Sequence, residues 1–145
     1  MAAPQFFTPP RVTPSRPKRR FTLEQANRTL PLVKRIVTDI VQCHKAVTVQ
    51  QEQLQQVSPN SKIRTEAERA VERSIERLNQ LLEELSNVGC EMKDFQMGLT
   101  DFIGRHQGRD VCLCWKLGEA SIGYWHEMDA GFGGRQPIAT LDERE

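Results

Sequence analysis

Apolar residues recur every three or four positions between Val33 and Val57, and this period predicts one long helix. They fill the a and d sites of the heptads with one polar lapse at Gln50, and are Val33, Ile36, Ile40, Cys43, Val47, Leu54 and Val57. At about 1.5 Å per residue, a helix over residues 31–57 would be about 40 Å long. A helix of this length needs a partner for its apolar stripe.

The partner is predicted directly downstream, after a turn at Ser58 to Lys62. Thr65 and Glu68 have the spacing of a capping box, and Gly89 stands where a helix C-cap glycine belongs. The inward positions between them are Ala67, Val71, Ser74, Ile75, Leu78, Leu81, Leu82, Leu85 and Val88. Two long helices joined by a short turn predict an antiparallel helical hairpin over residues 22–88.

The first helix should begin at a capping box formed by Thr22 and Gln25. Pro31 cannot donate a backbone hydrogen bond and clashes with the preceding turn. We therefore expect a short helix from about residue 22 to 30, a kink or break, and then the long helix with proline at its first position.

After Gly89 the pattern changes to short segments at residues 90–93, 99–103, 111–116 and 121–126, separated by turns at Gly98, Gly108 and Gly118. This spacing predicts an antiparallel β-meander over residues 90–127. Alternation along the third segment puts Val111, Leu113 and Trp115 on one face and Cys112, Cys114 and Lys116 on the other. A sheet with one apolar face needs a cover, so we predict an α+β fold in which the long antiparallel helical hairpin packs on a small antiparallel β-meander.

The chain divides into a single folded domain at residues 21–140, a basic tail at residues 1–20 and a polar end at residues 141–145, which is expected to fray. The tail holds five prolines, five basic residues and no acid, so it carries +5 while the rest of the chain carries −4. We expect it to be disordered. It would serve as a solvated linker or as a weak phosphate-binding or docking arm.

Composition limits the classes of partner and the compartment. A net charge of +1 gives no general attraction to nucleic acid beyond a weak one through the tail. No apolar run is long enough for a membrane span, and the tail lacks the apolar core of a secretory signal. The spacing of Cys43, Cys90, Cys112 and Cys114 fits neither a disulfide framework nor a zinc knuckle. We therefore expect a cytoplasmic protein with reduced thiols.

A candidate site lies in the segment from Tyr124 to Pro137. His126, Glu127 and Asp129 combine an imidazole with two carboxylates, which is the material of a metal site or of a general base. Strand alternation sends His126 and Glu127 to opposite faces, and His126 can meet Asp129 only if the chain turns at Met128. Zinc needs three or four protein ligands, and this segment supplies two. Three interpretations of His126 and Asp129 therefore stay open: metal binding, binding of a non-metal ligand, and hydrogen bonding to the backbone at a sheet edge.

Neighbouring groups extend the candidate site. Residues 129–137 form a Gly-rich loop around Arg135, which could bind an anion or simply make a tight turn. Trp115 and Trp125 could stack on a planar ligand, although we expect at least one of them in the core.

Other cysteine and histidine side chains receive mainly structural interpretations. Cys112 and Cys114 could bind a soft metal, or could be buried against the helices as small apolar residues. Cys43 and His44 should pack along the helix, and His106 should be solvated in a polar turn.

Four motifs carry a resemblance to a known family. They are RFTLEQANRTLPLVKRIVTDI at residues 20–40, GLTDF at 98–102, LCWKLGE at 113–119 and YWHEMDAGFGGRQP at 124–137. In this order they resemble a prokaryotic family of uncharacterised proteins catalogued as domain of unknown function 2203. The family implies no activity, substrate or cofactor. Its signature positions here are Trp115, Trp125, His126, Glu127, Asp129, Gly131, Phe132 and Arg135. The chain departs from the family pattern at residues 94–97.

Three functions remain as hypotheses. The first is a non-catalytic binding or assembly module, because Val37, Ile75 and Leu82 widen the apolar stripe beyond a two-helix seam. That excess must cover the sheet or contact a second copy in a coiled-coil homodimer. The second is a small enzyme, such as a hydrolase, with His126 as base supported by Glu127, Asp129 or Arg135. The third is a metal- or anion-binding regulator that uses the same residues.

Overall fold

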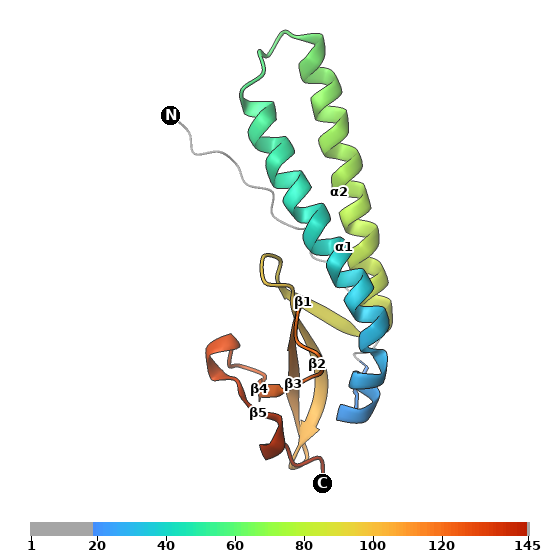
Figure 1. Ribbon diagram of the computed structural model, residues 1–145, viewed down its shortest axis with the longest axis vertical. Coiled ribbons are helices and arrows are strands. Elements are labelled where there is room, and N and C mark those ends of the chain that lie inside the picture. The colour runs from blue at the N-terminus through green and yellow to red at the C-terminus, as the bar shows by residue number, and fades with distance from the viewer. Residues whose placement is uncertain (1–18, 145) are drawn as a thin grey trace.

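A computed structural model describes residues 19–144 and shows a helical hairpin followed by an antiparallel sheet (Figure 1). Helices α1 and α2 cover Leu23–Gln55 and Lys62–Val88. The strands are β1 (Cys90–Asp94), β2 (Leu99–His106), β3 (Arg109–Lys116), β4 (Tyr124–Glu127) and β5 (Gln136–Pro137). Two 3-10 turns, η1 and η2, span Phe132–Gly134 and Ile138–Thr140. The predicted α+β fold is confirmed, and the hairpin extends far beyond the sheet.

Helix α1 starts as the sequence predicts but does not break. The Thr22 side chain accepts from the Gln25 amide at 3.1 Å, and the Gln25 side chain accepts from the Thr22 amide at 2.9 Å. The break expected at Pro31 is wrong, because α1 runs through it. A proline inside a helix costs about 3 kcal/mol. Leu30 and Val33 are both buried beside it, and each burial stabilises by about 1.5–3 kcal/mol, so packing outweighs the cost.

Helix α2 begins earlier than predicted. Its N-cap is Ser61 and not Thr65, and the Ser61 hydroxyl accepts from the amide of Ile63 at 3.0 Å. The guanidinium of Arg64 donates to the carbonyls of Leu54 and Val57, which ties the start of α2 to the end of α1. The predicted C-cap is confirmed, since Gly89 adopts the left-handed conformation with φ 111°.

The strands follow one another in the order β1-β2-β3-β4-β5, and each pair is antiparallel. The meander is confirmed, and β5 adds an edge strand that the sequence did not reveal. Strands β2 and β3 are longer than predicted because a two-residue turn joins them. Gln107 and Gly108 both have positive φ, 49° and 81°, as a type I′ hairpin turn requires.

The core lies between the helices and one face of the sheet. That face presents Phe102, Val111, Leu113, Trp115 and Trp125, and all five join the buried residues of α1 and α2 in one cluster. Gly104 on β2 leaves room for Leu113, since a Cβ at this position would lie 2.7 Å from Leu113 Cγ. Both tryptophans therefore belong to the core.

The C-terminal segment packs on the domain, so the expectation of a frayed end is wrong for residues 141–144. Leu141 packs against the core. The Asp142 amide donates to Nδ1 of His106 at 2.9 Å, and the Glu143 carboxylate accepts from the amide of Leu23 at 2.9 Å. His106 is correspondingly buried and stacks on Trp125 with ring centroids 4.3 Å apart, which corrects the expectation that it is solvated.

The expected basic tail falls mainly on residues 1–18, which lie outside the described residues. Arg20, at its predicted end, forms a β-bridge with Ile103 and an ion pair with Asp110. The ordered domain therefore includes Arg19 and Arg20. Within residues 19–144, no helix is both long enough and apolar enough to cross a membrane.

Leu30 and Leu32 offer a matched test of this packing. Leu30 is 3% exposed and Leu32 is 47% exposed on the same helix. We expect Leu30→Ala to lower the free energy of unfolding by about 2–5 kcal/mol, because it leaves a cavity in the core. Leu32→Ala should change it by about 0.5 kcal/mol or less. Urea unfolding followed by circular dichroism measures both, and equal losses would contradict this core.

Candidate metal centre

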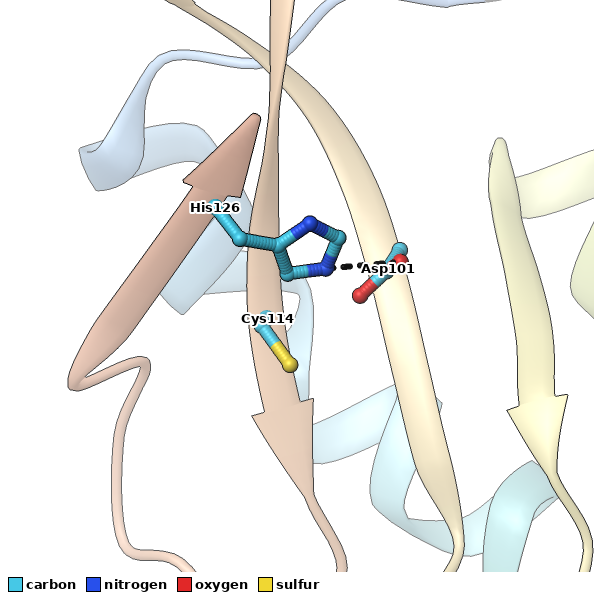
Figure 2. A group of neighbouring side chains, drawn as sticks. All are labelled: Asp101, Cys114 and His126. Carbon is cyan, nitrogen blue, oxygen red and sulfur yellow. Dashed lines mark ion pairs between the residues drawn. The ribbon is translucent and has the colours of Figure 1, made fainter. Parts of the chain in front are cut away.

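Three side chains meet on the sheet face that points away from the helical core. They are Asp101 on β2, Cys114 on β3 and His126 on β4, and Figure 2 shows them directed toward one another. Asp101 and Cys114 are direct cross-strand partners. One ligand atom from each residue lies within 4.8 Å of the other two. The residues are only 5%, 0% and 4% exposed, so bulk water is excluded from them.

The ring of His126 is held in one orientation. Its Nδ1 lies 2.8 Å from the carbonyl oxygen of Glu127. A carbonyl can only accept, so Nδ1 carries the proton and donates it. The other nitrogen, Nε2, then faces the Asp101 carboxylate, with 3.2 Å between Nε2 and Oδ2. A backbone carbonyl on one ring nitrogen is the usual way in which proteins fix the other as a metal ligand.

The Asp101 carboxylate is incompletely satisfied. Its Oδ1 atom is buried and accepts no hydrogen bond within the described part of the chain. Burying an ionised carboxylate is costly unless a charge or a hydrogen bond compensates it. Burial, reinforced by this carboxylate, raises the pKa of the Cys112 and Cys114 thiols to about 12. Without a bound cation, the thiols beside Asp101 are therefore protonated at neutral pH.

Arg135 covers the neighbouring part of the same face. Its Nη2 atom donates to Oε1 of Glu119 at 2.7 Å and to the backbone carbonyl of Cys114 at 3.3 Å. Its guanidinium carbon lies 4.1 Å from the ring centroid of Tyr124 and 5.0 Å from that of Phe132. The predicted Gly-rich loop thus folds over the sheet through η1. Arg135 is largely committed to the protein, although its buried Nε has no hydrogen-bond partner among the described residues.

Most of the other side chains proposed from the sequence lie elsewhere. Glu127 points to the opposite face from His126 and pairs with Arg109. Asp129 is exposed and is not among the side chains that meet His126 in this group. Trp115 and Trp125 are buried in the core and donate from Nε1 to the carbonyl of Glu119 and the hydroxyl of Thr140. Of the side chains proposed from the sequence in this segment, His126 belongs to the group of three and Arg135 lies beside it.

Asp101 is the member of the centre that the sequence analysis missed, and Cys114 was considered as a metal ligand only together with Cys112. Alternation places Cys114 on the correct strand face, but the ring of three appears only when the registers of β2, β3 and β4 are known. The prediction that Cys112 and Cys114 are buried against the helices is also wrong, because the helical core lies on the opposite face of β3. The signal that could have found the site is the acidic residue within the apolar strand Leu99–His106.

This donor set suits a transition-metal ion. Zinc binds thiolate at about 2.3 Å, imidazole at about 2.0–2.1 Å and carboxylate at about 2.0–2.2 Å. Around a tetrahedral ion these donors would lie about 3.3–3.6 Å apart. The Nε2 of His126 and Oδ2 of Asp101 are already 3.2 Å apart, and the widest separation in the group, at most 4.8 Å, would shorten by no more than about 1.5 Å. The Cys114 thiol would release its proton on binding.

Comparison with known proteins gives a family. The family model described as "Uncharacterized conserved protein (DUF2203)" matches residues 19–138, which include every residue of the centre. No curated protein and no solved structure matches the chain.

Thiol labelling tests the burial of this face in metal-free protein. Cys43 is half-buried on α1, whereas Cys112 and Cys114 are buried. We expect iodoacetamide at pH 8 to modify Cys43 first, because alkylation requires an accessible thiolate. Peptide mass spectrometry after a time course of labelling in a chelator gives the order. Modification of Cys112 or Cys114 ahead of Cys43 would show that the face is open.

Proposed function

We propose that this chain, which belongs to the DUF2203 family of uncharacterised conserved proteins, is a non-catalytic module that binds a zinc ion through Asp101, Cys114 and His126. A metal-binding role was one of the alternatives that the sequence left open. The ligands differ from the pair first considered, because two of them come from strands β2 and β3.

The arrangement of His126 and Asp101 carries this proposal. Because Nδ1 of His126 donates to a carbonyl, a neutral ring turns the lone pair of Nε2 toward a carboxylate oxygen 3.2 Å away. Two acceptors facing each other in a buried place repel, and a cation between them removes the repulsion. A second proton on the ring would also relieve it. That proton would still leave Oδ1 of Asp101 without a hydrogen-bond partner among the described residues.

The donor atoms favour zinc over calcium or magnesium. Calcium and magnesium prefer sites made only of oxygen, whereas zinc accepts nitrogen, oxygen and sulfur together. The near-complete burial of all three ligands favours a structural or regulatory ion over a catalytic one, since catalytic zinc keeps a position open to substrate. A thiolate ligand also requires reduced cysteines, which supports a cytoplasmic location.

Zinc binding is tested on untagged protein that has been stripped with a chelator and then given one equivalent of zinc. We expect native mass spectrometry to show one zinc ion per chain. Loss of a residue that only supports a metal ligand weakens metal binding by about 10–100-fold. Titration calorimetry should show a larger loss of zinc affinity in each of three ligand variants: Asp101→Asn, Cys114→Ser and His126→Ala. With free zinc at about 100 times its dissociation constant, the wild type should gain about 2.7 kcal/mol of stability.

Matched controls lie on helix α1. Cys43 donates to the carbonyl of Ser74, and His44 stacks on Phe95, so both are structural and distant in sequence from the centre. Cys43→Ser and His44→Ala should bind zinc as the wild type does. Failure of the wild-type protein to retain zinc, or undiminished binding by His126→Ala, would refute the proposed function.

A second candidate role is assembly of two copies through the helices. The hairpin projects beyond the sheet (Figure 1), and it exposes Val49 by 43% and Ile63 by 66%. Burial of these two side chains against a second chain would contribute favourable free energy, because removal of apolar surface from water drives association. Native mass spectra should then show a dimer that becomes a monomer in Val49→Glu. A wild-type monomer at every protein concentration would contradict this role.

A further inference from the structure

We propose that Cys112 is the fourth ligand of the zinc ion, so that the centre is a closed set of one carboxylate, two thiolates and one imidazole. This inference rests on the proposed function, because it completes the same site. Zinc in a structural site is almost always bound by four protein ligands, and Asp101, Cys114 and His126 supply three.

The position of Cys112 fits the missing ligand. It lies on β3 two residues before Cys114, so both thiols share the sheet face of the centre. Its direct cross-strand partner on β4 is His126, just as the partner of Cys114 on β2 is Asp101. Cys112 is 5% exposed, and the Asp101 carboxylate is among the groups that raise its pKa. Cys112 therefore lies on the same face of the sheet as the three ligands, beside His126 and two residues from Cys114, and its thiol would have to turn toward them to complete the set.

The present contact of the Cys112 thiol is weak enough to be exchanged. Its Sγ lies 3.6 Å from the thioether sulfur of Met128. A thioether is a poor hydrogen-bond acceptor, so turning the thiol away from Met128 loses little. On binding, the thiols of Cys112 and Cys114 would each lose a proton to solvent and form a zinc–sulfur bond.

The spacing of the two cysteines favours a shared ion over a disulfide. Residues two apart on a strand have Cα atoms about 6.6–6.8 Å apart, which is the upper limit for a disulfide. Two thiolates on tetrahedral zinc need their sulfur atoms only about 3.8 Å apart, nearly twice the length of a sulfur–sulfur bond. All four cysteines are free in the structure, which agrees with this preference.

The surrounding charges are suited to such a centre. A carboxylate and two thiolates around a divalent ion leave one net negative charge in a buried place. The guanidinium of Arg135 contacts the backbone oxygen of Cys114, and the charge of Lys93 acts on the Cys112 thiol. Both cations oppose the excess negative charge of a loaded centre.

X-ray absorption at the zinc edge counts the sulfur ligands directly. In wild-type protein loaded with one equivalent of zinc, we expect two sulfur atoms at about 2.3 Å and two nitrogen or oxygen atoms at about 2.0–2.2 Å. Cys112→Ser should retain one sulfur. The matched control Cys43→Ser should retain two, and Met128→Leu should also retain two, since its thioether is not a ligand.

The outcomes separate this inference from the proposed function. Zinc bound with one sulfur in the wild type, or two sulfurs in Cys112→Ser, would refute the role of Cys112 while leaving the three-residue centre intact. A sulfur lost in Met128→Leu would assign the fourth position to methionine and would also refute it. If the wild type binds no zinc, both proposals fall. A single sulfur in the wild type refutes the role of Cys112 even if a variant does not fold, and Met128→Leu separates the two possible sources of a second sulfur.

Discussion

The register of β2, β3 and β4 determines which side chains face the helices and which face away from them. It sets Phe102 opposite Leu113 and Leu113 opposite Trp125, which makes one face of the sheet apolar. The same register sets Asp101 opposite Cys114 on the reverse face. A slip of one residue would exchange the two faces, placing a carboxylate against the helices and a phenyl ring outside. The core and the group of Asp101, Cys114 and His126 are therefore specified together.

The two faces of the sheet are covered by different means. The helices cover one face with a broad apolar surface, while the loop after β4 covers part of the other through Arg135 and Phe132. A domain of this size buries a limited apolar area, and a single hairpin cannot shield both faces. Where the loop shields the second face from water, the polar side chains on that face need hydrogen-bond or charge partners within the protein. A bound ion joining three strands would meet that need.

The sequence predicted the elements that follow from local periodicity. The helical hairpin, the Thr22 capping box, the Gly89 C-cap and the strand alternation of Val111 to Lys116 are all confirmed. Local rules failed where tertiary contacts decide the outcome. Packing of Leu30 and Val33 carries α1 through Pro31, and stacking on Trp125 buries His106. Asp101 joins His126 from 25 positions earlier in the chain, a proximity that no short motif encodes.

The contact between the C-terminal segment and the start of α1 has a consequence for cooperativity. Leu23 donates its amide to Glu143, while Asp142 holds both His106 and the turn residue Gln107. The first helical turn, the tip of the β2–β3 hairpin and the last residues of the domain thus share one set of hydrogen bonds. Opening of the C-terminal segment would break its hydrogen bonds with both α1 and the hairpin tip. We therefore expect hydrogen exchange at the start of α1, at the hairpin tip and in the C-terminal segment to be coupled.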